Sequence, residues 1–367
     1  MKTGMVANPH IVNEQWIKRW TILCLVVLCA ASMDTRAQSA PDWLVAEPKA
    51  HGMRQETLAS FVETARSMSP LNSLIIARGD TTVMEWYAPG MTASRSTNIK
   101  SASKTVLSAL VGIAIREGYL EGPDQPIGPF FPDILDGTAP GDSVRKQITL
   151  GDLMTMRAGL ESTSFGNYGA WVSSRRWAED ALDRPMVDDV GGRMIYSTGS
   201  SHLVAVILEK ATGQSLRAFA QEHLFDPLGE RIGAWQKDPE GYYFGGNNLA
   251  VTPRALLKFG QLYLRGGSVL ESGQRVPVVP PAWIGASWNL RVLSSFRNFR
   301  YGYFWWMEEF GGERTYFAWG YGGQMLFVVP SLNLVTVMTS SLTGSNRGHS
   351  GRLFRFCRTI NRTLGAE

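Results

Sequence analysis

Ser101 and Lys104 form a Ser-x-x-Lys pair at the start of a segment, 103–117, that has helical periodicity. Residues three positions apart lie on one face of a helix, so the two side chains point in the same direction. The positive potential at a helix N-terminus favours a developing alkoxide on Ser101. Burial drives a lysine amine toward its neutral form, which can accept the serine proton. The pair predicts nucleophilic catalysis. An alternative reading of the segment is that Ser103 only caps the helix.

Tyr196 is a second candidate for proton transfer. It lies in a loop ahead of a clear helix, with Gly191 and Gly192 before it and Gly199 after it. A cationic lysine beside a phenol lowers the pKa of the phenol, which can then carry a proton to a leaving group. The alternative is a loop tyrosine whose ring serves only for packing.

The segment 318–325, AWGYGGQM, lies between two expected strands. Its three glycines allow the backbone to approach a ligand closely. A backbone N–H of this segment would complete an oxyanion hole with the N–H of Ser101. The alternative is a tight hairpin turn. The candidate oxyanion and substrate-binding residues are Trp319, Gly320, Tyr321 and Gly322.

Other catalytic schemes lack their residues. The sequence has no Gly-x-Ser-x-Gly elbow, no His-Glu-x-x-His pair and no glycine-rich phosphate loop ahead of a helix. The histidines are scattered, and we interpret His202 and His223, on helix-like segments, as structural. The net charge is +4, and no run of Lys or Arg forms the basic stripe that is typical of nucleic-acid-binding proteins. We therefore expect a small-molecule substrate and no cofactor, metal or nucleic-acid partner.

The hydrophobic patterns predict an α+β fold. After a polar lead-in at 41–56, two apolar runs at 71–77 and 82–87 indicate a β-hairpin, and the helix at 103–117 follows. Short aromatic and β-branched runs near the C-terminus indicate an antiparallel meander followed by a helix. The expected late strands are 301–307, 314–319, 325–329 and 334–339, and the expected last helix is 353–364. We expect an antiparallel sheet flanked by helices and built from both chain ends.

Helix signals and Pro/Gly loops dominate the middle of the chain. Thr149 and Asp152 suit a helix N-cap, with Gly159 as the expected end of that helix. A second helix should end at Gly213, and a third should begin at Thr252. The predicted organisation is a sheet domain from 40–122 and 291–367, with a mainly helical domain, 123–290, inserted into it.

The N-terminus resembles a targeting segment. Two basic residues precede an apolar run, 20–32, which has the length of a signal h-region and is short for a membrane span. Ala37 and Ser39 suit the positions before a cleavage site. We expect residues 1–39 to be a signal peptide of a periplasmic or secreted protein. The alternative, an uncleaved anchor, is the only membrane link we expect. Cleavage would leave Cys357 as the sole cysteine, which excludes an internal disulfide and a Cys/His zinc site.

Taken together, the three motif segments resemble the serine β-lactamase and penicillin-binding superfamily. The resemblance is to its class C and esterase side, and is closest for enzymes like 6-aminohexanoate-dimer hydrolase. It spans about 71–359 and keeps the motif order. The connecting phrases ITLGDLMTMRAGL, LFDPLG, TPRALLKFGQLYLRGG and GYGGQMLFVVPSLNLVTVM are also similar. The resemblance implies that Ser101 is the acylated nucleophile, Lys104 its base and Tyr196 the second-motif phenol.

Two motifs depart from the pattern of the superfamily. Its Tyr-x-Asn reads Tyr196-Ser197-Thr198, and its Lys-Thr-Gly or His-Thr-Gly reads Ala318-Trp319-Gly320, with Tyr321 as the implied oxyanion donor. The missing cation removes a partner for the carboxylate of a penicillin or a D-alanyl peptide. We therefore expect a serine hydrolase that acts on an ester or amide. The alternatives are a β-lactamase or D-alanyl peptidase, and a penicillin-binding-like receptor that is acylated without turnover.

Overall fold

The computed structural model describes Met1, residues 41–343 and residues 348–367. Contacts divide the chain into two units, 1–42 and 43–367, and the helices and strands of the described residues all lie in the second unit. The expected signal peptide therefore falls, apart from Met1, outside the described residues. In the part of the chain that the structure describes, no helix is long and apolar enough to cross a membrane.

An antiparallel sheet drawn from both ends of the chain forms the centre of the second unit. Its strand order is β2-β1-β12-β11-β10-β9-β8-β7, which places the C-terminal strand β12 beside the N-terminal hairpin. The strands of this sheet are β1 (Leu71–Arg78), β2 (Thr81–Tyr87), β7 (Val292–Leu293), β8 (Arg300–Tyr301), β9 (Trp306–Phe310), β10 (Glu313–Gly320), β11 (Gln324–Val329) and β12 (Leu334–Ser340). The predicted α+β fold, with a sheet built from both chain ends, is confirmed.

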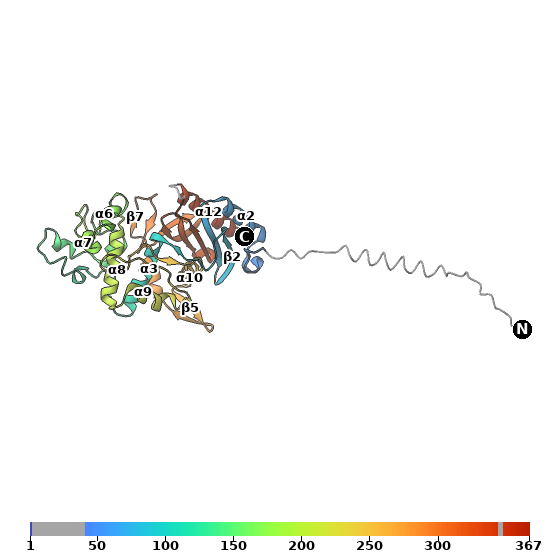
Figure 1. The fold of residues 1–367 in the computed structure, drawn as a ribbon, viewed down its shortest axis with the longest axis horizontal. Coiled ribbons are helices and arrows are strands. Elements are labelled where there is room, and N and C mark those ends of the chain that lie inside the picture. Colours follow the sequence, from blue (N-terminus) through green and yellow to red (C-terminus); the bar gives the residue numbers. More distant parts are fainter. Residues whose placement is uncertain (2–40, 344–347) are drawn as a thin grey trace. The chain divides into compact units, whose positions relative to one another are not determined.

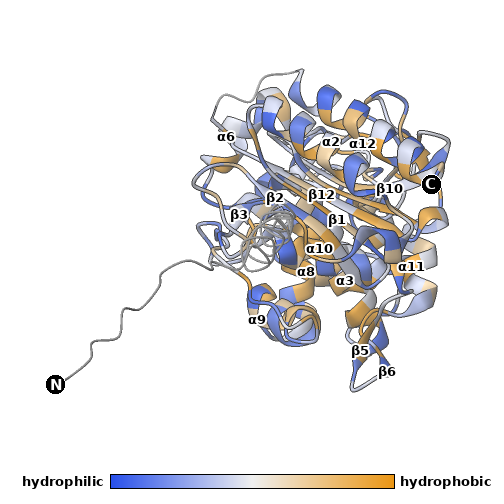
Figure 2. Cartoon of the chain, turned by 90° about the vertical axis from the view of Figure 1, so that its right-hand side faces the viewer, coloured by the Kyte–Doolittle hydropathy of each residue, from blue (hydrophilic) through white to orange (hydrophobic). Residues whose placement is uncertain are grey.

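Helices cover both faces of the sheet (Figures 1 and 2). On one face lie α2 (Gln55–Ser67), which packs on β1, and α12 (His349–Gly365), which packs on β9. On the other face α10 (Pro253–Leu264) packs on β12, β11 and β1. Because both faces are covered, β11 and β12 are buried along their whole length. β11 is accordingly almost continuously apolar, whereas β12 also buries the polar side chains of Thr336, Thr339 and Ser340.

The middle of the chain forms a group of helices beside the sheet (Figure 1). The long helix α8 (Thr198–Thr212) packs against α3 (Lys104–Arg116), α5 (Leu150–Met154) and α7 (Trp177–Leu182). The other helical elements of the second unit are η1 (Pro48–His51), η2 (Lys100–Ser103), η3 (Gly128–Phe130), α4 (Asp142–Arg145), η4 (Phe165–Asn167), α6 (Tyr168–Val172), α9 (Leu216–Ala220), η5 (Gln221–Phe225), α11 (Pro281–Ser287) and η6 (Pro330–Leu332). The domain division at 122 and 291 stays a prediction.

Two short strand pairs complete the fold. The hairpin of β5 (Ser268–Glu271) and β6 (Gln274–Pro277) projects from the molecule (Figure 2). β3 (Thr97–Asn98) pairs with β4 (Ala250–Val251), and the Ile99 N–H continues the pairing by donating to the Leu249 carbonyl at 2.9 Å. The second pair brings the chain before β4 next to the turn that carries Ser101.

Two predicted element boundaries are wrong. The expected strand 301–307 is interrupted after Tyr301, because Phe304 takes a φ of +62° and donates its N–H to the Met154 carbonyl instead of continuing the sheet. The helix that begins after Thr149 ends at Met154, ahead of the expected Gly159, because Met156 turns the chain with a φ of +61°.

The capping box at α5 generates a stability prediction. The Thr149 hydroxyl accepts from the Asp152 N–H at 3.1 Å, and the Asp152 carboxylate accepts from the Thr149 N–H at 3.0 Å. Thr149→Ala should lower the free energy of unfolding by about 1 kcal/mol, because a helix N–H loses its partner. Chemical denaturation measures this difference. Thr149→Ser keeps the hydroxyl and should stay close to the parent protein, and equal losses for both substitutions would contradict the assignment.

Candidate active site

Ser101 lies in the η2 turn, immediately before α3. The Ser103 hydroxyl donates to the Lys100 carbonyl at 2.7 Å, and the Ala102 N–H donates to the Ile99 carbonyl at 3.1 Å. Because Ser103 makes this contact, its side chain does not cap α3. The turn therefore presents Ser101 at the beginning of the helix, as the Ser-x-x-Lys spacing predicts.

Lys104 is buried directly beneath Ser101. Its side chain is almost fully inaccessible, and its Nζ lies 3.2 Å from the Ser101 Oγ and 2.8 Å from the Gly246 carbonyl oxygen. Burial disfavours the charged amine and lowers the pKa of Lys104 to about 7. At neutral pH a large fraction of Lys104 is therefore neutral and able to accept a proton from Ser101.

Tyr196 lies close to both Lys104 and Ser101. The Lys104 Nζ sits 5.2 Å from the centre of the Tyr196 ring, and the phenol is hydrogen-bonded to the Ser101 hydroxyl. Burial raises the pKa of Tyr196 to about 12, while the hydrogen bond to Ser101 opposes this rise. The lowered pKa expected from the sequence is wrong, because desolvation disfavours the phenolate as it disfavours the ammonium ion. Tyr196 is thus a protonated phenol, able to donate.

Contacts with helix α8 hold the Gly246 carbonyl in position. The Ser201 hydroxyl is 3.0 Å from the Gly245 carbonyl oxygen, and the Gly245 N–H donates to the Nδ1 of His202 at 3.3 Å. His202 and Asp238 are buried together, with the His202 Nε2 2.9 Å from the Asp238 carboxylate. These contacts fix the backbone at Gly245 and Gly246 in the orientation that faces Lys104.

Gly246 has a glycine-specific conformation. Its φ is +70°, in the left-handed region that favours glycine. A Cβ added there would lie 2.5 Å from the Lys104 Cγ and 2.6 Å from the Ser201 Oγ. Both the backbone angle and the surrounding space therefore require glycine at this position.

A cavity of about 510 Å³ opens above Ser101. The candidate residues that line it are Ser101, Tyr196, Trp319, Tyr321 and Gly322. The cavity is also lined by Phe165, Phe296, Trp306, His349 and Ser350. Of the candidate residues, Lys104 lies beneath the cavity and Gly320 beside it, so the structure brings all seven together.

The end of β10 packs against the turn that carries Ser101. A Cβ added to Gly320 would lie 2.2 Å from the Ile99 carbonyl oxygen and 3.2 Å from the Ala102 nitrogen. This close approach requires glycine at position 320. It also brings the backbone that follows, at Tyr321, next to the nucleophile turn.

His349 and Ser350, at the start of α12, also line the cavity. The Trp319 Nε1 donates to the Ser350 hydroxyl at 3.3 Å, and the His349 Nε2 lies 2.9 Å from the Ser340 Oγ. Burial and the nearby Arg352 guanidinium lower the pKa of His349 to about 4, so this imidazole is neutral. Among the residues that the structure describes, no group of three or more His, Cys, Asp or Glu side chains could hold a metal ion.

The sequence analysis missed residues whose roles depend on the fold. Gly246 was detectable only as one of a Gly-Gly pair followed by two asparagines. Phe165 and Phe296 had no periodic signal, because both lie in loops or short turns. The contact of His202 with the Gly245 N–H could not be read from its helical spacing.

Comparisons with known proteins agree with this geometry. A family model described as Beta-lactamase matches residues 66–355. Among curated proteins, a 6-aminohexanoate-dimer hydrolase of Paenarthrobacter ureafaciens is 24% identical over 352 residues, which cover 90% of this chain and 87% of that protein. The resemblance predicted from the motifs is confirmed.

Solved structures share the fold at low sequence identity. EstCE1, a hydrolase with promiscuous acyltransferase activity, is 16% identical with a TM-score of 0.67, covering 84% of this chain and 99% of that one. A penicillin-binding protein homolog from Caulobacter crescentus is 15% identical with a TM-score of 0.67, covering 87% of this chain and 98% of that one. At such identities the likeness shows the architecture alone.

The contact between Lys104 and Gly246 generates a prediction with a matched control. Gly246→Ala should slow covalent modification of Ser101 by a fluorophosphonate about 100-fold, because the new Cβ displaces Lys104 and small misplacements have effects of this size. Gly213→Ala is the control, since Gly213 also has a left-handed φ, +67°, but no neighbour within 4 Å. Gly213→Ala should lose stability and keep the modification rate. Equal rates in the two folded variants would contradict a role for the contact.

Proposed function

The chain belongs to the β-lactamase family of serine hydrolases, and from this premise we propose that it cleaves an ester or an uncharged amide through an acyl-Ser101 intermediate. One observation carries the proposal: the buried Lys104 amine, with a pKa of about 7, lies 3.2 Å from the Ser101 hydroxyl. A neutral amine at hydrogen-bond distance from a serine is the arrangement that general-base activation requires.

In the proposed acylation, Lys104 accepts the Ser101 proton as the Ser101 Oγ attacks the substrate carbonyl. The tetrahedral intermediate collapses when Tyr196 protonates the leaving group and the bond to it breaks. The resulting phenolate takes a proton from the Lys104 ammonium, so the serine proton has moved to the leaving group. The raised pKa of Tyr196 supports this order, because the phenol holds its proton until the leaving group becomes basic.

Deacylation reverses the direction of proton transfer. Water attacks the acyl ester while the neutral Lys104–Tyr196 pair takes its proton, and that proton returns to the Ser101 oxygen as the acid product departs. The backbone N–H groups of Ser101 and Tyr321 are the proposed oxyanion donors. The packing of Gly320 against the nucleophile turn supports this assignment, because it holds the two backbone segments together.

The cavity favours an uncharged substrate. Among its described lining residues there is no Lys, Arg, Asp or Glu, and Ala318-Trp319-Gly320 supplies no cation for a substrate carboxylate. The names of two relatives, a 6-aminohexanoate-dimer hydrolase and a hydrolase with acyltransferase activity, support amide or ester chemistry. Rapid turnover of nitrocefin would favour a β-lactamase instead, and stoichiometric acylation without release would favour a receptor.

Covalent labelling tests the nucleophile and its base together. A fluorophosphonate probe should modify Ser101, located by peptide mass mapping. The labelling rate should rise with pH through about 7, because protonated Lys104 cannot accept the serine proton. Labelling that persists in Ser101→Ala would overturn the assignment of the nucleophile. A rate that does not change between pH 5 and 9 would exclude Lys104 as the base.

Tyr196→Phe should slow the hydrolysis of amides more than that of nitrophenyl esters. An amide needs its nitrogen protonated as it leaves, whereas nitrophenolate departs without help. Loss of a general acid costs about two to four orders of magnitude, and this cost should fall on the amide. The measured quantity is the ratio of the two losses in kcat/KM. Lys104→Ala is the comparison and should slow the hydrolysis of both substrates. If Tyr196→Phe hydrolyses both substrates at wild-type rates, Tyr196 serves only for packing.

A further inference from the structure

Four aromatic rings form a continuous wall of the cavity beside Ser101. Phe165 lies 6.1 Å from Tyr196 and 5.5 Å from Phe296, measured between ring centres. Trp306 stacks on Tyr196 at 6.1 Å and meets Phe296 edge-on at the same distance. The rings come from separate chain segments, so the wall is a product of the fold. We call these four residues the aromatic wall.

Phe165 is unusual in both its backbone and its exposure. Its φ of +56° lies in the left-handed region, which is costly for a residue with a Cβ. Its side chain nevertheless remains 65% exposed, so burial of the ring does not offset the strain. Strained residues that persist at the rim of a site are candidates for function.

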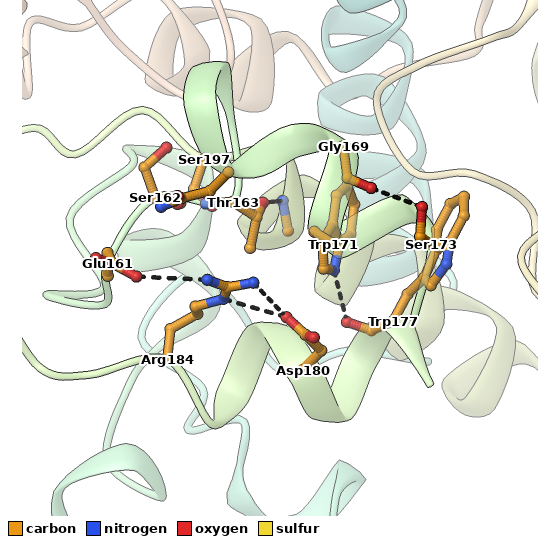
Figure 3. Close-up of polar contacts among 12 residues, drawn as sticks. Glu161, Ser162, Thr163, Gly169, Trp171, Ser173, Trp177, Asp180, Arg184 and Ser197 are labelled. Carbon is orange, nitrogen blue, oxygen red and sulfur yellow. Dashed lines mark hydrogen bonds and ion pairs between the residues drawn. The ribbon is translucent and has the colours of Figure 1, made fainter. Parts of the chain in front are cut away.

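Hydrogen bonds tie the turn before Phe165 to the segment that carries Tyr196. The Ser162 hydroxyl donates to the Tyr196 carbonyl at 2.6 Å, and the Thr163 N–H donates to the Ser197 hydroxyl at 3.1 Å. Figure 3 shows Ser162 and Thr163 beside Ser197 in this network. These contacts hold the turn that precedes Phe165 against the segment that carries Tyr196.

A second set of contacts anchors the base of the same turn. Arg184 is 3.4 Å from the Glu161 carboxylate and 2.8 Å from that of Asp180, which links the turn to α7 (Figure 3). On the opposite side, the Phe296 N–H donates to the Ser294 hydroxyl at 3.1 Å. The turn before Phe165 is therefore tied to α7, and a local hydrogen bond shapes the loop that carries Phe296.

We propose that the aromatic wall is a subsite for an uncharged aryl group of the substrate, with Phe165 as its specificity-determining residue. This inference rests on the proposed hydrolysis at Ser101. Aryl groups bury a large apolar area and gain further from edge-to-face contacts with aromatic neighbours. The described lining offers no charged side chain for a carboxylate or ammonium group. A cavity of about 510 Å³ accommodates an aryl group together with the reacting carbonyl.

The test compares esters that differ only in the aryl group. Methyl phenylacetate carries the ring on the acyl side, benzyl acetate carries it on the alcohol side, and methyl acetate has none. In the wild type, kcat/KM for at least one aryl ester should exceed that for methyl acetate by at least about tenfold. A methyl phenylacetate that carries a ring carboxylate should lose this advantage. The two aryl arms distinguish an acyl subsite from a leaving-group subsite.

Two variants distinguish the effect of the Phe165 ring from that of its left-handed backbone conformation. Phe165→Ala removes the ring and keeps the Cβ, whereas Phe165→Gly removes the ring and relieves the left-handed strain. Both should lower the ratio of kcat/KM for the preferred aryl ester to kcat/KM for methyl acetate by about tenfold. Phe165→Gly should also melt at or above the wild-type temperature, which a residue retained for folding would not do. Leu270→Ala, an exposed position on the β5–β6 hairpin, is the control and should change neither quantity.

The outcomes separate this inference from the proposed function. If wild-type protein hydrolyses methyl acetate and both aryl esters equally, or if Phe165→Ala slows all three alike, the aryl subsite is overturned and hydrolysis stands.

If no ester is hydrolysed, hydrolysis fails, and the subsite is then judged by binding of N-methylphenylacetamide to Ser101→Ala protein. Saturable quenching of tryptophan fluorescence by this amide supports the subsite if the affinity is lower in the double variant Ser101→Ala/Phe165→Ala. Absence of quenching overturns the subsite.

Discussion

The site depends on one contact, the buried Lys104 amine held between the Ser101 hydroxyl and the Gly246 carbonyl. An unpaired amine at this depth would be expensive, because a buried donor without a partner loses its hydration without compensation. The carbonyl supplies that partner and carries no negative charge. The amine therefore stays buried with a pKa of about 7, whereas a carboxylate partner would have favoured the ammonium ion. The pairing of β3 with β4 and the contacts of α8 with Gly245 position this carbonyl.

Burial acts on Lys104 and Tyr196 with opposite signs. It lowers the pKa of the amine to about 7 and raises that of the phenol to about 12, since in each case the charged form is the disfavoured one. The pair therefore rests as a neutral base beside a neutral acid. In the proposed reaction the ion pair of ammonium and phenolate forms only in passing, and its members neutralise each other by proton transfer. In the proposed mechanism, burial thus supplies both the base and the acid without a histidine.

The parts of the site that the sequence predicted are the local ones. The spacing of Ser101 and Lys104 within one helical turn and the capping box at Thr149 each depend on a few neighbouring residues. Gly246 was not predictable, because β3 and β4 are two residues each and leave no periodic pattern, although their pairing delivers the carbonyl across about 140 residues of chain. The direction of the Tyr196 pKa was mispredicted for a related reason. In the folded cleft burial raises the pKa of Tyr196, and it also removes much of the positive charge of Lys104 on which the prediction relied.

The departures from the superfamily motifs fit together physically. Where the third motif of the superfamily carries Lys or His, this chain has Ala318. The next residue, Trp319, has an indole that donates to Ser350 and lines the same cavity as Phe165 and Trp306. An alanine at the buried position 318 avoids the desolvation cost of a cation, and the Trp319 indole adds to the apolar surface of the cavity. The lack of a cation in the third motif and the aromatic lining of the cavity both support the proposal of an uncharged substrate.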